Sequence, residues 1–284
     1  MEGIIVQIIS NQYKVVDEKE NVINCIARGK LRNNEIVPVV GDRVKISENA
    51  ISEILPRHNY IKRPKIANIT QIVLVVSSKE PKPDILLLDK QIAFAENLGV
   101  KVVIAINKTD LANIKDLAEM YKKIDYPVIE MQAKNGIGIN NLSKYLKDNI
   151  TVFSGNSGVG KSSIINALFC KNITSEGEVS NKSKRGKNTT TAVTLYELEK
   201  DTYIADTPGF STFDINELEY KNLDKEFKEF LPYIEKCKYV GCSHIYESEA
   251  ECEIKQKVKN GNINMSRYEN YKKIYEEIKN NKKY

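Results

Sequence analysis

The sequence lacks any long apolar run, and this absence argues against a membrane-spanning helix. No stretch of it approaches the roughly 20 consecutive apolar residues that such a helix needs. Residues 1–4 also lack the basic region and apolar stretch that begin a secretion signal. We therefore expect a cytoplasmic protein with no membrane partner, and a monomer is the default expectation.

Cysteine and histidine are scarce, with five and two residues, yet four of these seven share one short segment. An odd number of cysteines in a reducing compartment argues against a disulfide framework. The segment holds three thiols and one imidazole, which suit a closed, tetrahedral and structural Zn²⁺ site. We predict one zinc ion bound by Cys237, Cys242, His244 and Cys252. The isolated Cys25 and Cys170 are predicted to be small buried side chains.

The net charge of +5 is unevenly placed along the chain. Residues 255–284 contain nine Lys or Arg and three Glu, an excess of six positive charges, so the rest of the chain is close to neutral. A local basic region can mark a phosphate-rich partner. It can equally be a solvated helix face, and charge alone leaves both interpretations open.

The first 67 residues contain five short β-like segments separated by turn residues. These segments are residues 3–9, 13–16, 22–27, 43–46 and 51–55. Five short strands in about 60 residues predict a small closed barrel of the OB type, and an SH3-like barrel would give much the same pattern. Four basic residues leave RNA contact by this domain open: Arg28, Lys30, Arg32 and Arg43.

The hydrophobic period changes after a basic, proline-containing connector at residues 56–65. Continuous apolar strands are predicted at 71–76, 101–106, 128–129, 151–153, 192–198 and 202–205, and helices at 86–98, 142–146 and 162–169. Apolar strands spaced by helices predict a parallel sheet covered on both faces. We predict an α/β nucleotide-binding domain over residues 68–214, after a barrel domain over residues 1–67.

Residues 215–284 are predicted to form a helical domain around the zinc ligands. Residues 266–269 have the pattern of a capping box at a helix start. An apolar stripe at helical spacing follows, formed by Tyr268, Tyr271, Ile274, Tyr275 and Ile278. Such a stripe can pack into a core or stack on bases, and we prefer packing.

A phosphate-binding motif follows one predicted strand and opens a helix. It comprises Gly155, Asn156, Ser157, Gly158, Val159, Gly160, Lys161, Ser162 and Ser163. The glycines let backbone N–H groups point at phosphate oxygens, and the helix N-terminus favours negative charge. We predict that Lys161 contacts the β- and γ-phosphates and that the Ser162 hydroxyl binds Mg²⁺.

A second loop follows another apolar strand, at the edge where open α/β sheets bind ligands. It reads Asn107, Lys108, Thr109 and Asp110. The Asp110 carboxylate can accept hydrogen bonds from two adjacent N–H groups of guanine, whereas adenine offers no such pair. Sites of this kind discriminate by about 10⁴ or more. Together the two loops predict GTP or GDP rather than adenine nucleotides.

Residues 206–209 follow the last predicted strand and match the position of a γ-phosphate sensor. We predict that Asp206 holds Mg²⁺ through water and that the Gly209 N–H senses the γ-phosphate. Thr190, at the end of the loop 181–191, is predicted to complete the Mg²⁺ shell, and γ-phosphate should order that loop. Residues 132–134 occupy the place of a short loop that supports the base.

The guanine loop precedes the phosphate loop, the reverse of the order in most chains that carry both. This order indicates a circularly permuted GTPase. With the zinc motif, it resembles the RsgA (YjeQ/YloQ) family of small ribosomal subunit biogenesis GTPases. Further matches are residues 40–44, 63–64, 67–69 and 267–268. The resemblance spans essentially the whole chain and implies an N-terminal OB-fold β-barrel, a central circularly permuted α/β P-loop GTPase domain and a C-terminal α-helical zinc-binding domain.

The resemblance also implies what the protein does. It implies binding to the 30S subunit and its 16S rRNA late in maturation, hydrolysis of GTP to GDP and phosphate there, and departure afterwards. Other 30S assembly factors are implied partners. One alternative is a GTP-dependent RNA-binding module whose hydrolysis is incidental. A zinc-containing DNA-binding regulator fits less well, because no helix follows the zinc ligands at the spacing of a DNA-reading finger.

Two departures from familiar patterns concern hydrolysis, for which Lys161, Asn188, Thr190 and Gly209 are the candidate residues. Asn188 stands where the family usually has a histidine, and Asn can orient water but cannot act as a base near neutral pH. Phe210 stands where many GTPases have a water-orienting Gln. We therefore predict slow intrinsic hydrolysis that the ribosome stimulates; help in trans reaches about 10³–10⁵ in other GTPases.

Overall fold

The computed structural model describes residues 1–27, 37–176, 193–206 and 217–281. Within these ranges, none of the helices combines the length and apolar character needed to cross a membrane. Several predicted residues lie outside the described ranges, so their roles stay predictions: Arg28, Lys30, Arg32, Asn188, Thr190, Gly209 and Phe210. The division of the chain at residues 67 and 214 also stays a prediction.

The N-terminal strands close into a barrel. They are β1 (Glu2–Ile9), β2 (Gln12–Asp17), β3 (Val22–Ala27), β4 (Arg43–Ser47) and β5 (Ala50–Ile54). Their order is β1-β2-β3-β5-β4, with β4 returning to β1 and β3 running parallel to β5. This Greek-key closure identifies the OB-fold rather than an SH3-like barrel. Alternate residues fill its core, including Cys25, which is buried as predicted.

The segment predicted as a plain connector contains a short hairpin, β6 (Tyr60–Lys62) and β7 (Lys65–Ala67). Residues on either side of this hairpin are held firmly against the barrel. Gly41 has φ +88°, and a Cβ there would lie 2.1 Å from the Ala67 carbonyl oxygen. The buried Asp42 carboxylate accepts from Arg57 Nε at 2.7 Å and Nη2 at 2.8 Å, while Asn68 donates to the Gly41 carbonyl. These contacts explain why residues 40–44 and 67–69 form linked motifs.

The central sheet contains six strands in the order β10-β9-β8-β11-β13-β12. They are β8 (Gln71–Ser77), β9 (Lys101–Asn107), β10 (Val128–Glu130), β11 (Ile150–Ser154), β12 (Thr194–Glu199) and β13 (Thr202–Asp206). All pair in parallel except β12, which runs antiparallel to β13. The predicted parallel sheet is thus confirmed, with one antiparallel edge strand.

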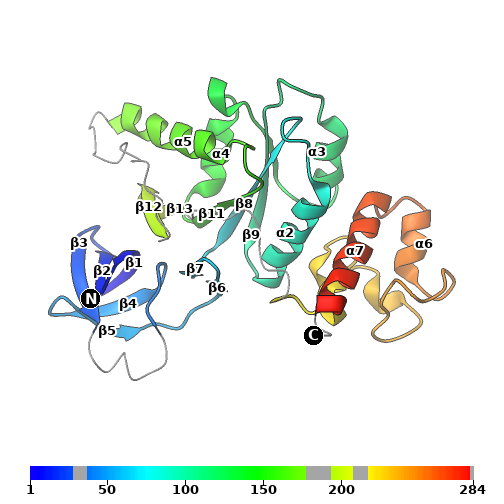
Figure 1. Ribbon diagram of the computed structural model, residues 1–284, viewed down its shortest axis with the longest axis horizontal. Coiled ribbons are helices and arrows are strands. Elements are labelled where there is room, and N and C mark those ends of the chain that lie inside the picture. Colours follow the sequence, from blue (N-terminus) through cyan, green and yellow to red (C-terminus); the bar gives the residue numbers. More distant parts are fainter. Residues whose placement is uncertain (28–36, 177–192, 207–216, 282–284) are drawn as a thin grey trace.

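Helices cover both faces of this sheet, as predicted (Figure 1). They are α2 (Ile85–Asn97), α3 (Lys115–Lys122), α4 (Ile139–Leu146) and α5 (Lys161–Glu176), with a 3₁₀ turn η1 (Ala133–Asn135). Separate core clusters form against α2 and α3 on one face and against α4 and α5 on the other. Cys170 of α5 is exposed, so its predicted burial was wrong: Ile164, Ile165 and Leu168 form the buried side of that helix.

One sheet runs through both the barrel and the central domain. β12 pairs with β13 on one side and, through Gln7 and Thr194, with β1 of the barrel on the other. The result is a continuous sheet of 11 strands among the described residues.

The C-terminal region is helical, as predicted. It contains η4 (Tyr220–Glu226), η5 (Ile234–Lys236), α6 (Glu253–Lys259) and α7 (Met265–Asn281), and Figure 1 shows α7 beside α2. The predicted apolar stripe of α7 is entirely buried in this domain's core, which confirms packing rather than base stacking. The capping-box prediction was wrong, because α7 begins at Met265 and Asn264 Oδ1 accepts from the Ser266 N–H at 2.8 Å.

Candidate functional site

The phosphate-binding motif lies between β11 and α5, in the strand–loop–helix context that it requires. Gly155 and Gly160 have φ of +141° and +102°. A Cβ on Gly155 would lie 2.1 Å from the Val75 carbonyl oxygen, and one on Gly160 would lie 2.2 Å from Asn107 Nδ2. Both positions therefore exclude a side chain for reasons of space as well as conformation.

Lys161 and the two serines after it occupy the first turn of α5. The Lys161 ammonium donates to the carbonyl oxygens of Gly155 at 2.5 Å and Asn156 at 2.9 Å, so it lies folded over its own loop. Burial lowers the pKa of Lys161. A phosphate bound above the loop would offset this effect, because its negative charge stabilises the Lys161 ammonium. Ser162 and Ser163 are exposed at the helix start, where a hydroxyl can reach a ligand.

Asn107 connects three loops through one buried amide. Its Nδ2 donates to the Val159 carbonyl of the phosphate loop at 3.0 Å, and its Oδ1 accepts from the Ala133 N–H at 3.0 Å. The side chain is 3% exposed, so both bonds are shielded from water. The guanine loop, the phosphate loop and residues 132–134 are therefore held together, as the sequence predicts for one nucleotide pocket.

The other guanine-loop residues differ in what they contact. Lys108, with φ +62°, donates from Nζ to the Gly158 carbonyl at 2.9 Å and to the Glu80 carbonyl. The Thr109 hydroxyl donates to the Met131 carbonyl at 3.2 Å. The Asp110 side chain is exposed, and the described residues give it no hydrogen bond. Three residues thus fix the loop and leave one carboxylate available to a base.

The two loops meet because their strands are parallel. β9 and β11 flank β8, and the guanine and phosphate loops leave β9 and β11 at the same carboxyl edge of the sheet. Asp206 ends the neighbouring parallel strand β13, at the same edge, while its side chain lies outside the described part. Asp206 is thus placed near the phosphate loop by topology, and Thr190 and Gly209 are not placed.

The four predicted zinc ligands converge. One ligand atom from each of Cys237, Cys242, His244 and Cys252 lies within 4.8 Å of the others, so the cluster could hold one metal ion. His244 faces the sulfurs with Nδ1, which lies 3.6 Å from Cys237 Sγ and 3.4 Å from Cys252 Sγ. Three of the four residues are buried. A compact S₃N set of this kind suits Zn²⁺.

The cysteine loop is attached to α7 and α6. The hydroxyls of Tyr268 and Tyr271 donate to the carbonyls of His244 at 2.7 Å and Ser243 at 2.9 Å. Lys255 Nζ donates to the Ile245 carbonyl at 2.8 Å. Besides packing in the core, the two buried tyrosines therefore fix, through their hydroxyls, the backbone of the loop that carries the His244 imidazole.

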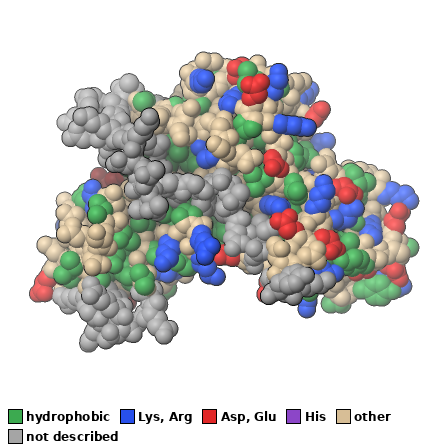
Figure 2. Space-filling view, viewed as in Figure 1, with side chains coloured by type: hydrophobic (Ala, Val, Ile, Leu, Met, Phe, Trp, Pro, Cys, Tyr) green, Lys and Arg blue, Asp and Glu red, His purple; other side chains and the backbone are tan. Residues whose placement is uncertain are grey.

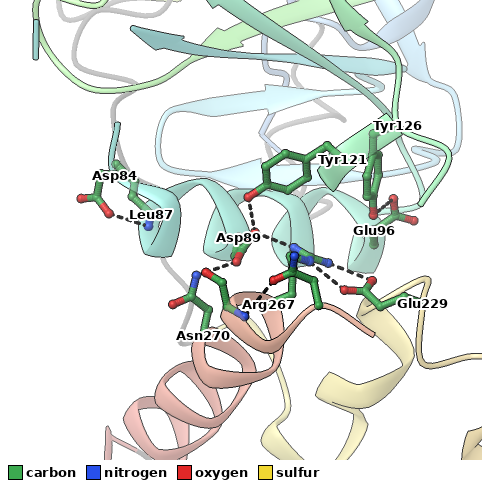
Figure 3. A network of polar contacts seen from close by, with 11 residues as sticks. Asp84, Leu87, Asp89, Glu96, Tyr121, Tyr126, Glu229, Arg267 and Asn270 are labelled. Atoms are coloured by element: carbon green, nitrogen blue, oxygen red, sulfur yellow. Dashed lines mark hydrogen bonds and ion pairs between the residues drawn. The ribbon is translucent and has the colours of Figure 1, made fainter. Parts of the chain in front are cut away.

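A buried polar network joins α2 of the central domain to the C-terminal domain (Figure 3). The Asp89 carboxylate accepts from the Tyr121 hydroxyl at 2.7 Å, Arg267 Nη1 at 2.5 Å and Asn270 Nδ2 at 2.7 Å. Arg267 also donates to both Glu229 oxygens, at 2.7 and 3.0 Å. This network explains the motif at residues 267–268. No sequence signal pointed to Asp89 or Glu229, since they lie far from Arg267 in the chain.

Helix α2 also contacts β11, the strand that leads into the phosphate loop. Gln91 Nε2 donates to the Ser154 hydroxyl at 2.9 Å, and Ser154 immediately precedes Gly155. Neighbouring positions of α2 thus contact the C-terminal domain and the strand that carries the phosphate loop.

Fold and site together define a class: a P-loop GTPase in which the guanine loop precedes the phosphate loop, that is, a circularly permuted GTPase. Comparison with known proteins agrees. The RsgA GTPase profile matches residues 54–216, and the RsgA N-terminal domain profile matches residues 2–53. The chain therefore belongs to the RsgA GTPase family, and its predicted family and GTPase activity are confirmed at that level.

Individual relatives match over nearly their whole length. The small ribosomal subunit biogenesis GTPase RsgA of Ruminiclostridium cellulolyticum is 41% identical, covering 98% of this chain and 93% of that protein. The same-named protein of Clostridium kluyveri is 40% identical, covering 100% of both. YjeQ from Thermotoga maritima superposes with a TM-score of 0.86 at 36% identity, covering 98% of both chains. YloQ, described as a circularly permuted GTPase, gives 0.82 at 32% identity, covering 99% of this chain and 95% of YloQ.

Proposed function

We propose that this GTPase acts in late maturation of the small ribosomal subunit, binds 16S rRNA within the 30S particle and leaves after GTP hydrolysis. The full-length likeness to relatives named for small-subunit biogenesis supports this role. The observation that carries the GTP-dependent part of the proposal is the Asn107 amide, which joins the guanine loop, the phosphate loop and residues 132–134 into one nucleotide pocket. We place the protein in the cytoplasm as a monomer, with other assembly factors as further partners.

The nucleotide would be bound by residues from both loops. Asp110 would accept from the guanine N–H groups, with Asn107, Lys108 and Thr109 holding its loop. The backbone of residues 155–160 would surround the phosphates, and Lys161 would leave its loop carbonyls to contact the β- and γ-phosphates. Ser162, Thr190 and Asp206 would hold Mg²⁺, which neutralises the charge that develops on the phosphates.

Hydrolysis by the isolated protein should be slow. Gly209 would sense the γ-phosphate and Asn188 would orient water, but neither Asn188 nor Phe210 can act as a base near neutral pH. Lys161 would stabilise the transferred phosphoryl group. The missing contribution would come from the docked 30S subunit, by analogy with other GTPases in which help in trans is worth about 10³–10⁵ in rate.

The distribution of basic side chains favours RNA contact at the β6–β7 hairpin over RNA contact at the basic C-terminal region. Several lysines of the basic C-terminal region have acidic partners within their own domain, for example Lys257 with Glu253 and Lys259 with Glu249. On the face seen in Figure 2, basic side chains instead gather at the β6–β7 hairpin. Its turn exposes Lys62, Arg63 and Lys65, which suits the phosphates of rRNA. Of these three, Lys62 has a long ion pair, with Nζ 3.8 Å from a Glu217 carboxylate oxygen, and its side chain remains largely exposed.

Cys237, Cys242, His244 and Cys252 would hold a structural Zn²⁺, with no position left open for catalysis. Burial raises the pKa of the Cys242 thiol. Capture of the ion would therefore release a proton from this sulfur, and metal binding should weaken as the pH falls. The ion would fix the loop that α7 already holds through Tyr268 and Tyr271.

The decisive experiment is GTP turnover by the purified protein with 30S, 50S or 70S particles at low and high salt. We expect slow turnover alone and strong stimulation by 30S, fading as salt rises because phosphate contacts release counterions. Fast turnover without ribosomes would contradict the proposal. Single-turnover hydrolysis that 30S leaves unchanged, with GTP still required for 30S binding, would instead establish the GTP-dependent RNA-binding module.

A further inference from the structure

Beside the cysteine cluster, two buried side chains that approach each other each leave a polar atom without a hydrogen-bond partner. Among the described residues, only three buried side-chain polar atoms lack a hydrogen bond, and two of them are His244 Nε2 and Asp224 Oδ1. The other Asp224 oxygen, Oδ2, lies 3.5 Å from His244 Nε2. A buried polar group left unpaired costs about 1–3 kcal/mol, so such a pair requires an explanation.

The orientation of the imidazole supplies that explanation. His244 presents Nδ1 to the sulfurs, within 3.6 Å of Cys237 Sγ and 3.4 Å of Cys252 Sγ. A cation held there would take the lone pair of Nδ1, so the imidazole proton must lie on Nε2. That N–H then points toward the Asp224 carboxylate, and a movement of a few tenths of an ångström gives a normal hydrogen bond.

Building on the zinc site proposed above, we infer that Asp224 is the outer-sphere partner of the zinc ligand His244, and that through this pair the ion holds η4 in place. Asp224 acts on the metal only through the imidazole, so it is a positioning residue. Carboxylates of this kind fix the tautomer and ring orientation of a metal-bound histidine.

The surroundings of Asp224 make His244 its natural partner. Among the described residues, His244 is the one basic side chain within ion-pair distance of this carboxylate. The nearby side chain of Glu226 is acidic, and its charge and that of Asp224 repel each other. Without a proton on His244 Nε2, the buried Asp224 carboxylate would face a nitrogen lone pair and would lack a hydrogen-bond donor. With that proton, the carboxylate gains an N–H donor on the ring that binds the ion.

The second half of the inference rests on where η4 lies. Residues 217–219 lead into η4 from the GTPase side, and its Leu223 is buried in one cluster with Phe227, with Ala93 of α2 and with α7. The cysteine loop itself starts later, at Cys237. The Asp224–His244 pair therefore lets one ion fix two separate segments: the loop that carries its ligands and the segment that connects the GTPase domain to that loop.

The first test measures zinc affinity of the full-length protein by competition with a chromophoric chelator. The near-isosteric Asp224→Asn should bind zinc about 10-fold more weakly, and Asp224→Ala up to about 100-fold more weakly. Glu226→Gln removes a carboxylate from the same 3₁₀ helix, one that makes no hydrogen bond or ion pair with His244 among the described contacts, and it should bind zinc like the wild type. Co²⁺ absorption of Asp224→Asn should keep the pattern of three thiolates and one imidazole, because no ligand is lost.

Hydrogen exchange of η4 amides supplies the second readout. In the wild type, removing zinc should accelerate exchange in residues 220–226 as well as in the cysteine loop. In zinc-loaded Asp224→Asn, η4 should exchange faster while the cysteine loop stays protected. This inference alone would be overturned if Asp224→Asn bound zinc as tightly as the wild type, or if Glu226→Gln lost as much zinc affinity as Asp224→Asn. A wild-type protein that binds no zinc would overturn the zinc site as well.

Discussion

Replacing Arg267 should loosen the C-terminal domain from the GTPase domain. The guanidinium is 1% exposed and lies between two buried carboxylates. Its Nη1 lies 2.5 Å from Asp89 Oδ1, and its Nε lies 2.7 Å from Glu229 Oε1. Its carbon Cζ also lies 4.6 Å from the centre of the Phe227 ring. In Arg267→Met the side-chain volume is largely kept, while both carboxylates lose their cation.

The magnitude follows from the cost of an uncompensated buried charge. Removing one partner of a buried ion pair typically costs about 3–5 kcal/mol, and Tyr121 and Asn270 would offset part of this by still donating to Asp89. Against a total stability of about 5–15 kcal/mol, this is a large loss. We expect the C-terminal domain to unfold at markedly lower urea than in the wild type.

The assay is urea unfolding followed by far-ultraviolet circular dichroism, with hydrogen exchange to locate the loss. The matched control is Lys272→Met on the same helix, whose pair with Glu269 is partly exposed and should be worth no more than about 1 kcal/mol. The triple variant Asp89→Asn, Glu229→Gln, Arg267→Met removes all three charges and should recover much of the loss. If Arg267→Met lowers the free energy of unfolding no more than Lys272→Met does, the network does not hold the domains together and the prediction is refuted.

Three further predictions concern the nucleotide and pH. Asp110→Asn should weaken GTP binding by up to about 10⁴-fold and favour xanthine nucleotides, because an amide can donate where the carboxylate accepts; titration with fluorescent nucleotides measures both, and unchanged GTP affinity would contradict it. Gly160→Ala should abolish GTP binding in the same titration, since its Cβ would lie 2.2 Å from Asn107 Nδ2. Burial, with the charges of Glu96 and Asp224, raises the pKa of Glu226 to about 7 from 4.5, so the native state retains a proton that the unfolded chain loses. Stability should fall as pH rises from about 4.5 to 7, and the advantage of Glu226→Gln over wild type in urea unfolding should grow across that range; a constant difference would refute it.

The parts of this protein that sequence predicts well are those in which chemistry fixes a local spacing. The phosphate loop needs its glycines within six residues, and the zinc ligands lie within sixteen, so both were found and both converge in space. The β3 strand begins and ends where its alternating pattern predicts. The order of the two nucleotide loops sufficed to predict the permuted topology.

The parts that sequence missed depend on contacts between distant residues or on weak local patterns. Helix α3 was not predicted because it buries only Ala118 and Tyr121, too few for an apolar stripe. The hairpin β6–β7 has strands of three residues each, below the length at which a period can be recognised. Asp89 and Arg267 are 178 positions apart, and only the folded chain brings them together.

The pairing of β12 with β1 has a consequence for dissecting this protein. β12 meets the barrel through one residue pair, Gln7 and Thr194, at the first position of the strand, so a GTPase domain expressed without its first residues would lose the one strand contact among the described residues that covers this end of the sheet edge. Unpaired edge strands recruit other chains. A fragment without the barrel should therefore aggregate more readily than the full chain.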